Sequence, residues 1–440
     1  MWTPAGEAKG YRQNRQATVA AHTDPELIPF AKRLAYTAQR QRIDTGTSLA
    51  DRHSTTMGIH FSTEELAARR EAAQRAMRDQ GLHGLLMFRQ ESMFYLTGYD
   101  TFGYCFFQCL YLGADGRVVL LTRAPDLRQA QHTSVIEDIR VWVDAAGKNP
   151  ANDLHALLNE LGASGQRLGI EYDAYGLTAH NWRRIEQKLN GFCEFQDASD
   201  LVTRLRVVKS SKELEYVRRA AELADEALTE AIELTEAGAF EGDILAAMHS
   251  AIFRGGGDYP GNEFIIGSGS DALLCRYFTG RRHLSADDQL TLEFAGVYRH
   301  YHACLMRTLL IGRVDPEHER MHAACVDAMH ACLDALRPGD PMGSVFDAHA
   351  RVMDAAGFAQ HRMNACGYSL GTTYTPTWMD WPMFYTGNPV LVEPDMVFFL
   401  HMILMNSDAN RAMTLGQTIR VTDSGCEHLS RHPLDLIVKQ

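Results

Sequence analysis

Glu293 is the only carboxylate within the mostly apolar residues 289–297, whose composition is typical of a buried β-strand. An ionised carboxylate is costly to bury unless it is paired with a positive charge or used in chemistry. A desolvated glutamate with a raised pKa can take a proton from water or attack a substrate directly. A buried ion pair with Arg307 or Arg276 is the structural alternative, and the sequence leaves both interpretations open.

Other side chains could complete a site around such a carboxylate. His401 lies in the apolar run 397–404 and could protonate a leaving nitrogen, although a lone histidine there is often a core residue. The glycine-flanked Tyr368 could donate a hydrogen bond to a developing oxyanion, or it could simply pack. His302 and Cys304 alternate on one face of a strand, so Cys304 could be a nucleophile, but no cysteine-hydrolase motif surrounds it.

The segment 372–394 is rich in Gly, Pro and Trp and is predicted to be a long loop, which in compact domains is often functional. Its aromatic side chains could form a wall for a compact, cationic ligand. These side chains are Tyr374, Trp378, Trp381 and Phe384. The alternative is a proline-stiffened surface loop.

Residues 318–322 match the HExxH zinc pattern, at the start of a helix that follows Asp315-Pro316. Charged residues in a first turn usually face solvent, and the spacing of His318, His322 and Cys325 is that of a packing face. Packing is therefore favoured over zinc. The glycine runs 255–257 and 267–270 lack the Lys-Ser/Thr of a phosphate loop and are expected to be turns.

The expected secondary structure divides the chain into three parts. Residues 1–57 show weak periodicity and are expected to be a poorly ordered, basic extension. In residues 58–200, strands near 84–88, 117–121, 139–143 and 167–171 alternate with helices, which predicts a small α/β domain. Residues 201–440 form a second, α+β domain. Its expected helices are 212–234, 241–254, 316–336 and 345–356, and its expected strands include 289–295 and 301–311.

The composition of this 440-residue chain argues against some classes of binding partner and location. A net charge of −12 argues against nucleic acid, because phosphate binding needs clustered Lys and Arg. No apolar run has the length of a membrane helix, and no export signal is recognised at the start. Nine scattered cysteines without CxxC spacing indicate reduced thiols and a cytoplasmic protein.

Several motifs from about residue 61 onward resemble the creatinase, aminopeptidase P and prolidase superfamily. They are 204–215 (RLRVVKSSKELE), 301–308 (YHACLMRT), 367–371 (GYSLG), 393–397 (EPDMV) and 421–429 (VTDSGCEHL). Each is weak alone, but their order and spacing cover nearly 380 residues. The resemblance implies a creatinase-like N-terminal domain over 58–200, followed by a catalytic domain with the pita-bread fold over 201–440.

The superfamily's metallopeptidases hold two metal ions with two Asp, one His and two Glu. The resemblance places these positions on Glu293, Cys304, Tyr368, His401 and either Gly416 or Gln417. Hard divalent ions prefer several carboxylates, and this set offers one, so no metal or other cofactor is expected. Glu293, Cys304 and His401 are all zinc ligand types and could bind zinc if they converge.

Metal-free members of the superfamily, creatinase and the ectoine hydrolases, cleave C–N bonds in small amidine or guanidine compounds. The run 293–296, together with Tyr301-His302 and Gly367-Tyr368, looks most like the ectoine hydrolases. This likeness implies a metal-independent C–N hydrolase with Glu293 as nucleophile or general base, assisted by His401 and Tyr368. Arg276 replaces a functional histidine of that group and suggests a substrate that bears a carboxylate. The residues expected to contact substrate are Arg276, His302, Cys304, Arg307 and Trp378.

Two other functions are considered. One is an Xaa-Pro metallopeptidase with altered ligands, and the other is a non-catalytic pita-bread module that binds peptides or proteins. The resemblance also implies a homodimer in which each small domain lies near its partner's cleft. Aromatic residues often anchor interfaces, so the candidate contacts are Phe102, Tyr104 and Phe107.

Overall fold

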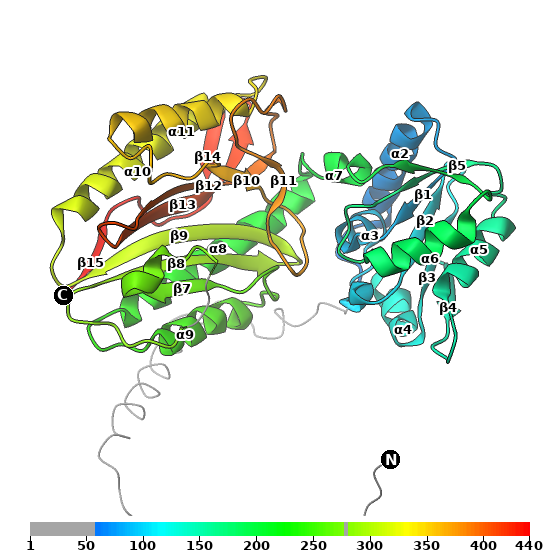
Figure 1. The fold of residues 1–440 in the computed structure, drawn as a ribbon, viewed down its shortest axis with the longest axis horizontal. Helices are drawn as coiled ribbons and strands as arrows, with labels where there is room; N and C mark the ends of the chain where they lie inside the picture. The colour runs from blue at the N-terminus through cyan, green and yellow to red at the C-terminus, as the bar shows by residue number, and fades with distance from the viewer. Residues whose placement is uncertain (1–57, 277–279) are drawn as a thin grey trace, which may run out of the picture. The chain divides into compact units, whose positions relative to one another are not determined.

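The computed structural model describes residues 58–276 and 280–440. The extension expected over 1–57 lies outside these described residues. The described chain has an N-terminal α/β domain and a C-terminal domain built on a larger sheet (Figure 1). No helix among the described residues is long and apolar enough to cross a membrane. All nine cysteines are free.

The N-terminal domain contains a six-stranded sheet of order β4-β3-β2-β1-β5-β6. Its strands are β1 Gly84–Met87, β2 Cys109–Gly113, β3 Val118–Arg123, β4 Asp138–Trp142, β5 Arg167–Ile170 and β6 Glu194–Asp197. Its helices are α2 Thr63–Asp79, α3 Gln90–Thr97, α4 Ala124–Thr133, α5 Pro150–Glu160, α6 Ala179–Leu189 and α7 Leu201–Leu205, with a 3₁₀ turn at Gly103–Cys105. Successive strand residues face opposite ways, so one face packs on α2, α3, α4 and α7 and the other on α5 and α6.

The C-terminal domain contains a nine-stranded sheet with the path β11-β10-β12-β13-β9-β8-β7, to which β14 and β15 add at β13 and β9. Its strands are β7 Ile265–Ser268, β8 Asp288–Tyr298, β9 Tyr301–Ile311, β10 Gly367–Ser369, β11 Asp380–Met383, β12 Val397–Asn406, β13 Arg411–Thr422, β14 Gly425–His428 and β15 Ile437–Lys439. Its helices are α8 Ser211–Leu234, α9 Glu241–Arg254, α10 Pro316–Ala335 and α11 Gly343–Ala355, with a 3₁₀ turn at Gly269–Leu273.

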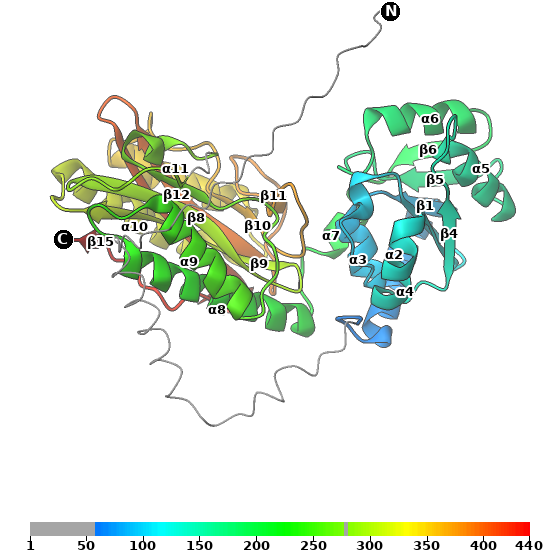
Figure 2. The same ribbon diagram turned by 90° about the horizontal axis from the view of Figure 1, so that it is seen from below.

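Helices cover one face of this sheet (Figure 2). Leu292 and Phe294 of β8 belong to the core beneath α8 and α9, while Leu400 and Met402 of β12 belong to the core beneath α10 and α11. The long strands pair antiparallel in continuous register from β8 through β9 and from β12 through β13. The opposite face of the sheet, called the inner face below, therefore carries Glu293 and the residues in register with it.

Local sequence explains why α8 begins where it does and lies so close to β8. Ser210 and Glu213 form a reciprocal capping box that satisfies backbone N–H groups at the start of the helix. Gly296 allows the close approach, because a Cβ there would collide with the carbonyl oxygen of Ala220 in α8. The glycine of the 293–296 run therefore has a packing role.

The structure corrects several sequence expectations. Predicted helix 212–234 and strand 301–311 correspond to α8 and β9, but α3, α4, β2 and β6 were not predicted. The interface hypothesis for Phe107 is wrong, because its side chain is buried against Phe88 and Trp142. Phe102 is 79% exposed, and the hydroxyl of Tyr104 donates to the carbonyl of Thr375.

Candidate active site on the inner face of the sheet

Strand register brings most of the predicted residues together. Directly opposed residues of an antiparallel pair share a face of the sheet. Glu293 of β8 opposes Met306 of β9, which opposes Gly416 of β13, which opposes His401 of β12. Cys304 lies two residues before Met306 on β9, and Tyr368 of β10 opposes Phe399, two residues before His401. Glu293, Cys304, Tyr368, His401 and Gly416 therefore all lie on the inner face.

Glu293 is a desolvated carboxyl group, and among the described residues the Tyr368 hydroxyl is its hydrogen-bond donor. Burial raises its pKa to about 7, and the charge of Arg276 and the hydrogen bond from Tyr368 offset only part of this rise. The Tyr368 hydroxyl lies 3.4 Å from Glu293 Oε1. The indole N–H of Trp378 in turn donates to the Tyr368 hydroxyl over 2.8 Å, which directs the phenolic proton towards Glu293.

The hydrogen bonds from Trp378 to Tyr368 and from Tyr368 to Glu293, called the relay below, predict an effect on the pKa of Glu293. Tyr368→Phe removes the donor that favours ionised Glu293, so the pKa of Glu293 should rise above about 7, by less than about one unit for a single long hydrogen bond. Infrared titration of the carboxyl band, with Glu293→Gln identifying the band, measures it. Phe399→Leu is the control, because Phe399 contacts the Tyr368 ring without a polar bond. An unchanged or lower pKa in Tyr368→Phe would contradict the relay.

His401 is buried next to Tyr368, with ring centroids 5.6 Å apart. Burial lowers its pKa to about 3, so the imidazole is neutral near pH 7. Its Nδ1 is buried and has no hydrogen-bond partner among the described residues. A neutral ring at this position can donate or accept a hydrogen bond, but it does not carry an imidazolium proton.

The two remaining β9 candidates on this face are less reactive than their residue types suggest. Burial raises the pKa of Cys304 well above its usual value, and the negative charge of Glu293 adds to this rise, so the thiol stays protonated. Burial lowers the pKa of His302 to about 3. The ring of His302 joins two loops, since Nε2 accepts from the N–H of Gly261 and Nδ1 lies 2.9 Å from the carbonyl of His300.

The two arginines have very different environments. Arg307 opposes Leu292, so it lies on the face away from Glu293, where it donates to the carbonyl of Gly416 over 2.7 Å. The Glu293–Arg307 ion-pair hypothesis is therefore wrong. Arg276 is exposed, forms no ion pair with the described residues, and directs its guanidinium N–H groups to the sulfur of Met379.

Next to the inner face is a pocket of about 640 Å³ that contains Arg276. Ile265 and Met383 line it, and these residues oppose Glu293 and Tyr368 respectively in the sheet. The pocket therefore reaches the sheet neighbours of Glu293 and Tyr368, which are not themselves among its lining residues. Both domains contribute to its wall, because Arg89, Glu91, Asp173 and Tyr175 line it together with residues of the 372–383 segment.

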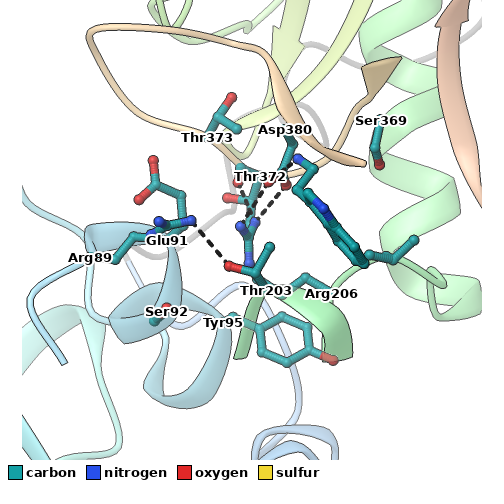
Figure 3. A network of polar contacts seen from close by, with 12 residues as sticks. Arg89, Glu91, Ser92, Tyr95, Thr203, Arg206, Ser369, Thr372, Thr373 and Asp380 are labelled. Atoms are coloured by element: carbon teal, nitrogen blue, oxygen red, sulfur yellow. Dashed lines mark hydrogen bonds and ion pairs between the residues drawn. The ribbon is translucent and has the colours of Figure 1, made fainter. Parts of the chain in front are cut away.

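The 372–380 loop is held at this pocket by a buried ion pair that the sequence did not reveal. Both terminal nitrogens of Arg206 contact the Asp380 carboxylate, at 2.9 and 3.0 Å, and Arg206 also donates to the carbonyl of Thr372 (Figure 3). The predicted aromatic wall is only partly present. Trp381 lines the pocket, whereas Trp378 is buried and Phe384 packs in the core with Phe398.

The donor set does not fit a dinuclear metal centre. Gly416, not Gln417, occupies the fifth metal position on the inner face, and a Cβ at Gly416 would lie 2.7 Å from the Phe399 ring. Gln417 points away and bonds His428. Throughout the described residues, no three His, Cys, Asp or Glu side chains are placed to share a metal ion. Neither Glu293, Cys304 and His401 nor residues 318–322 are therefore grouped as three ligands of one zinc ion in this structure, and His318 instead bonds Gln289.

Two protein-family models match the chain. Residues 215–423 match "Metallopeptidase family M24", and residues 69–208 match "Creatinase/Prolidase N-terminal domain". Among curated proteins, the ectoine hydrolase of Halomonas elongata is 28% identical over 409 residues, which cover 87% of this chain and 99% of that protein.

Solved structures with the same fold include a dipeptidase from Mycobacterium ulcerans and a recombinant prolidase from Thermococcus sibiricus. Their TM-scores are 0.75 and 0.77, with 24% and 18% sequence identity. Each match covers 86% of this chain, and it covers 99% and 100% of the respective structure. At these identities the likeness concerns the fold, and it agrees with the two-domain fold expected from the sequence.

Proposed function

Because the chain belongs to the M24 pita-bread superfamily, has a creatinase-type N-terminal domain and is a hydrolase of that family, we propose that it cleaves a C–N bond in a small amidine, guanidine or amide without a metal ion. The observation that carries this proposal is Glu293, a buried carboxyl group with a pKa near 7 and a phenol aimed at it. A carboxyl group of this pKa can both accept and return a proton near neutral pH.

In the proposed reaction, Glu293 takes a proton from water while the oxygen of that water bonds to the substrate carbon. The Tyr368 hydroxyl stabilises negative charge developing near the carboxylate, and the Trp378 indole keeps that hydroxyl in place. Protonated Glu293 then gives the proton to the leaving nitrogen as the C–N bond breaks. The neutral His401 ring assists by hydrogen bonding to that nitrogen. Direct attack by Glu293 is the alternative first step.

Arg276 is proposed to bind a carboxylate of the substrate. Its guanidinium forms no ion pair with the described residues, and it lies close enough to Glu293 to lower the pKa of that group. An arginine recognises carboxylates through paired N–H groups. Cys304 and His302 border the site on β9, while Arg307, on the other face of the sheet, is not included.

Turnover is expected to continue after exhaustive treatment with a chelator, because no three His, Cys, Asp or Glu side chains of the described residues are placed to share a metal ion. The test is a substrate screen with ectoine, creatine, cyclic amidines and Xaa-Pro dipeptides, run with and without chelator. Activity lost on chelation and restored by Mn²⁺ or Zn²⁺ would favour a metallopeptidase with altered ligands. Binding without turnover of any compound would favour a non-catalytic module.

The assembly and location are also proposed. We expect a homodimer, and the 79% exposed side chain of Phe102 remains a candidate contact. Reduced cysteines are expected of a protein that works in the cytoplasm.

A further inference from the structure

The pocket beside Glu293 contains a second carboxylate that the proposed chemistry does not use. Glu91 lies in the first turn of α3 in the N-terminal domain and lines the same 640 Å³ pocket as Arg276. Its Oε1 accepts a hydrogen bond of 3.0 Å from the backbone N–H of Tyr374, in the loop that borders the pocket. Glu91 is therefore placed against the pocket by both domains.

The arginines near Glu91 bind other partners. Arg206 is held by Asp380 and the Thr372 carbonyl, and Arg89 donates to Thr203 and lies 3.4 Å from Asp173. No described residue forms an ion pair with Glu91, and its hydrogen-bond donors among them are backbone N–H groups, those of Tyr374 and of Glu91 itself. Figure 3 shows the Glu91 carboxylate directed away from Arg206, with no dashed line to it.

A buried carboxylate without an ion pair does not stabilise the fold, so folding alone does not explain Glu91. Burial raises the pKa of Glu91 in spite of the charges of Arg206 and Arg89, which means that the surroundings penalise the ionised form. A glutamine would accept the same hydrogen bond from Tyr374 without a buried charge. A carboxylate with this environment at a pocket wall is explained by a positive charge that arrives with a ligand.

We propose that Glu91 is a specificity-determining residue that binds an ammonium group of the substrate. With Arg276 at the carboxylate, the substrate would then be a zwitterion whose charged ends contact the two domains and whose C–N bond lies at Glu293. This substrate class rests on the proposed function, but the Glu91 subsite can be tested by binding alone.

The test uses three ω-N-acetylated diamino acids that differ in chain length: Nγ-acetyldiaminobutyrate, Nδ-acetylornithine and Nε-acetyllysine. Each is paired with its desamino analogue, which lacks only the ammonium group. Dissociation constants are measured by calorimetry on the full chain carrying Glu293→Gln, so that no probe is consumed. For at least one chain length, the dissociation constant of the desamino analogue should be at least about 10-fold larger than that of the ammonium form.

Adding Glu91→Gln should bring this ratio close to one, with a melting temperature equal to or above that of the parent. Asp173→Asn is the matched control, because Asp173 lines the same pocket but its side chain is 93% exposed and already faces Arg89. The ratio should persist in that control. A ratio that survives Glu91→Gln, or that falls equally in Asp173→Asn, would overturn the proposal.

Two further outcomes also decide it. Failure of every probe pair to bind would overturn the subsite, as would a lower melting temperature in Glu91→Gln with an unchanged ratio, which assigns Glu91 a structural role. Loss of the proposed function is distinguishable from these outcomes. If the parent protein hydrolyses no compound but shows the ammonium preference through Glu91, the subsite stands and the hydrolysis does not.

Discussion

Glu293→Gln is expected to lower kcat by about 10³-fold, within the range found for removing a general base. Glutamine has nearly the same shape and can still accept the hydrogen bond from Tyr368, but it cannot take a proton from water. Steady-state kinetics and calorimetric binding on the same preparation measure the effect. Binding should be retained, because Arg276 is unchanged. Parent-like turnover in the variant would contradict a catalytic role.

The pH dependence of kcat/KM should report the pKa of Glu293. If ionised Glu293 is the working form, kcat/KM of the parent rises with pH and levels off above about 7. The variant should lose this limb. Thr291→Val is the control, since Thr291 is on the same face two residues away and, among the described residues, its side chain bonds only the Thr308 hydroxyl. It should keep the limb and most of the activity.

Glu293→Gln should also stabilise the fold at alkaline pH. A folded-state pKa raised from 4.5 to about 7 means that the folded chain holds the proton more tightly, so stability falls as pH rises through this window. Above pH 7 the buried charge then costs about 3 kcal/mol, which glutamine removes. Urea unfolding of both proteins at pH 5 and pH 8 tests this. Destabilisation at pH 8 would mean that Glu293 is a structural group.

Strand periodicity explains why part of the site was predictable. Glu293 and Cys304 belong to motifs of fixed spacing on paired strands, and alternation with a period of two places them on one face. The same rule explains why the predicted Glu293–Arg307 ion pair is wrong. A shift of one residue along a strand moves a side chain to the other face of the sheet, and the register places Arg307 on the face away from Glu293.

Contacts between distant segments could not be predicted in this way. Arg206 lies within a recognised motif, but its partner Asp380 is 174 residues further along the chain, in a segment expected to be a loop. Glu91 belongs to α3, which was not predicted, and it meets Tyr374 only through the arrangement of the two domains. No periodicity in a single sequence records such pairs, because they depend on how separate elements pack.

Asp380→Ala is expected to destabilise the fold by about 3–5 kcal/mol, the cost of leaving a buried charge without its partner. The side chains of Arg206 and Asp380 are 2% and 8% exposed. Arg206 Nε already has no partner among the described residues, and the carbonyl of Thr372 cannot neutralise the guanidinium. Lys209 is a second buried cation: burial lowers its pKa to about 8 and the charge of Asp380 offsets part of this fall, so the loss falls on two positive charges. Urea unfolding at pH 7 measures the change.

Control variants distinguish the stability cost of breaking this buried ion pair from that of breaking an exposed one. Asp200→Ala breaks the Arg204–Asp200 pair, whose side chains are 58% and 56% exposed, and should cost no more than about 0.5 kcal/mol. Replacing both Arg206 and Asp380, by Met and Leu, should recover only the part of the lost stability that comes from the unpaired guanidinium, because Lys209 stays buried without the charge of Asp380. If Asp380→Ala costs no more than Asp200→Ala, the pair does not hold the 372–380 loop. The position of Tyr374 against Glu91 would then need another cause.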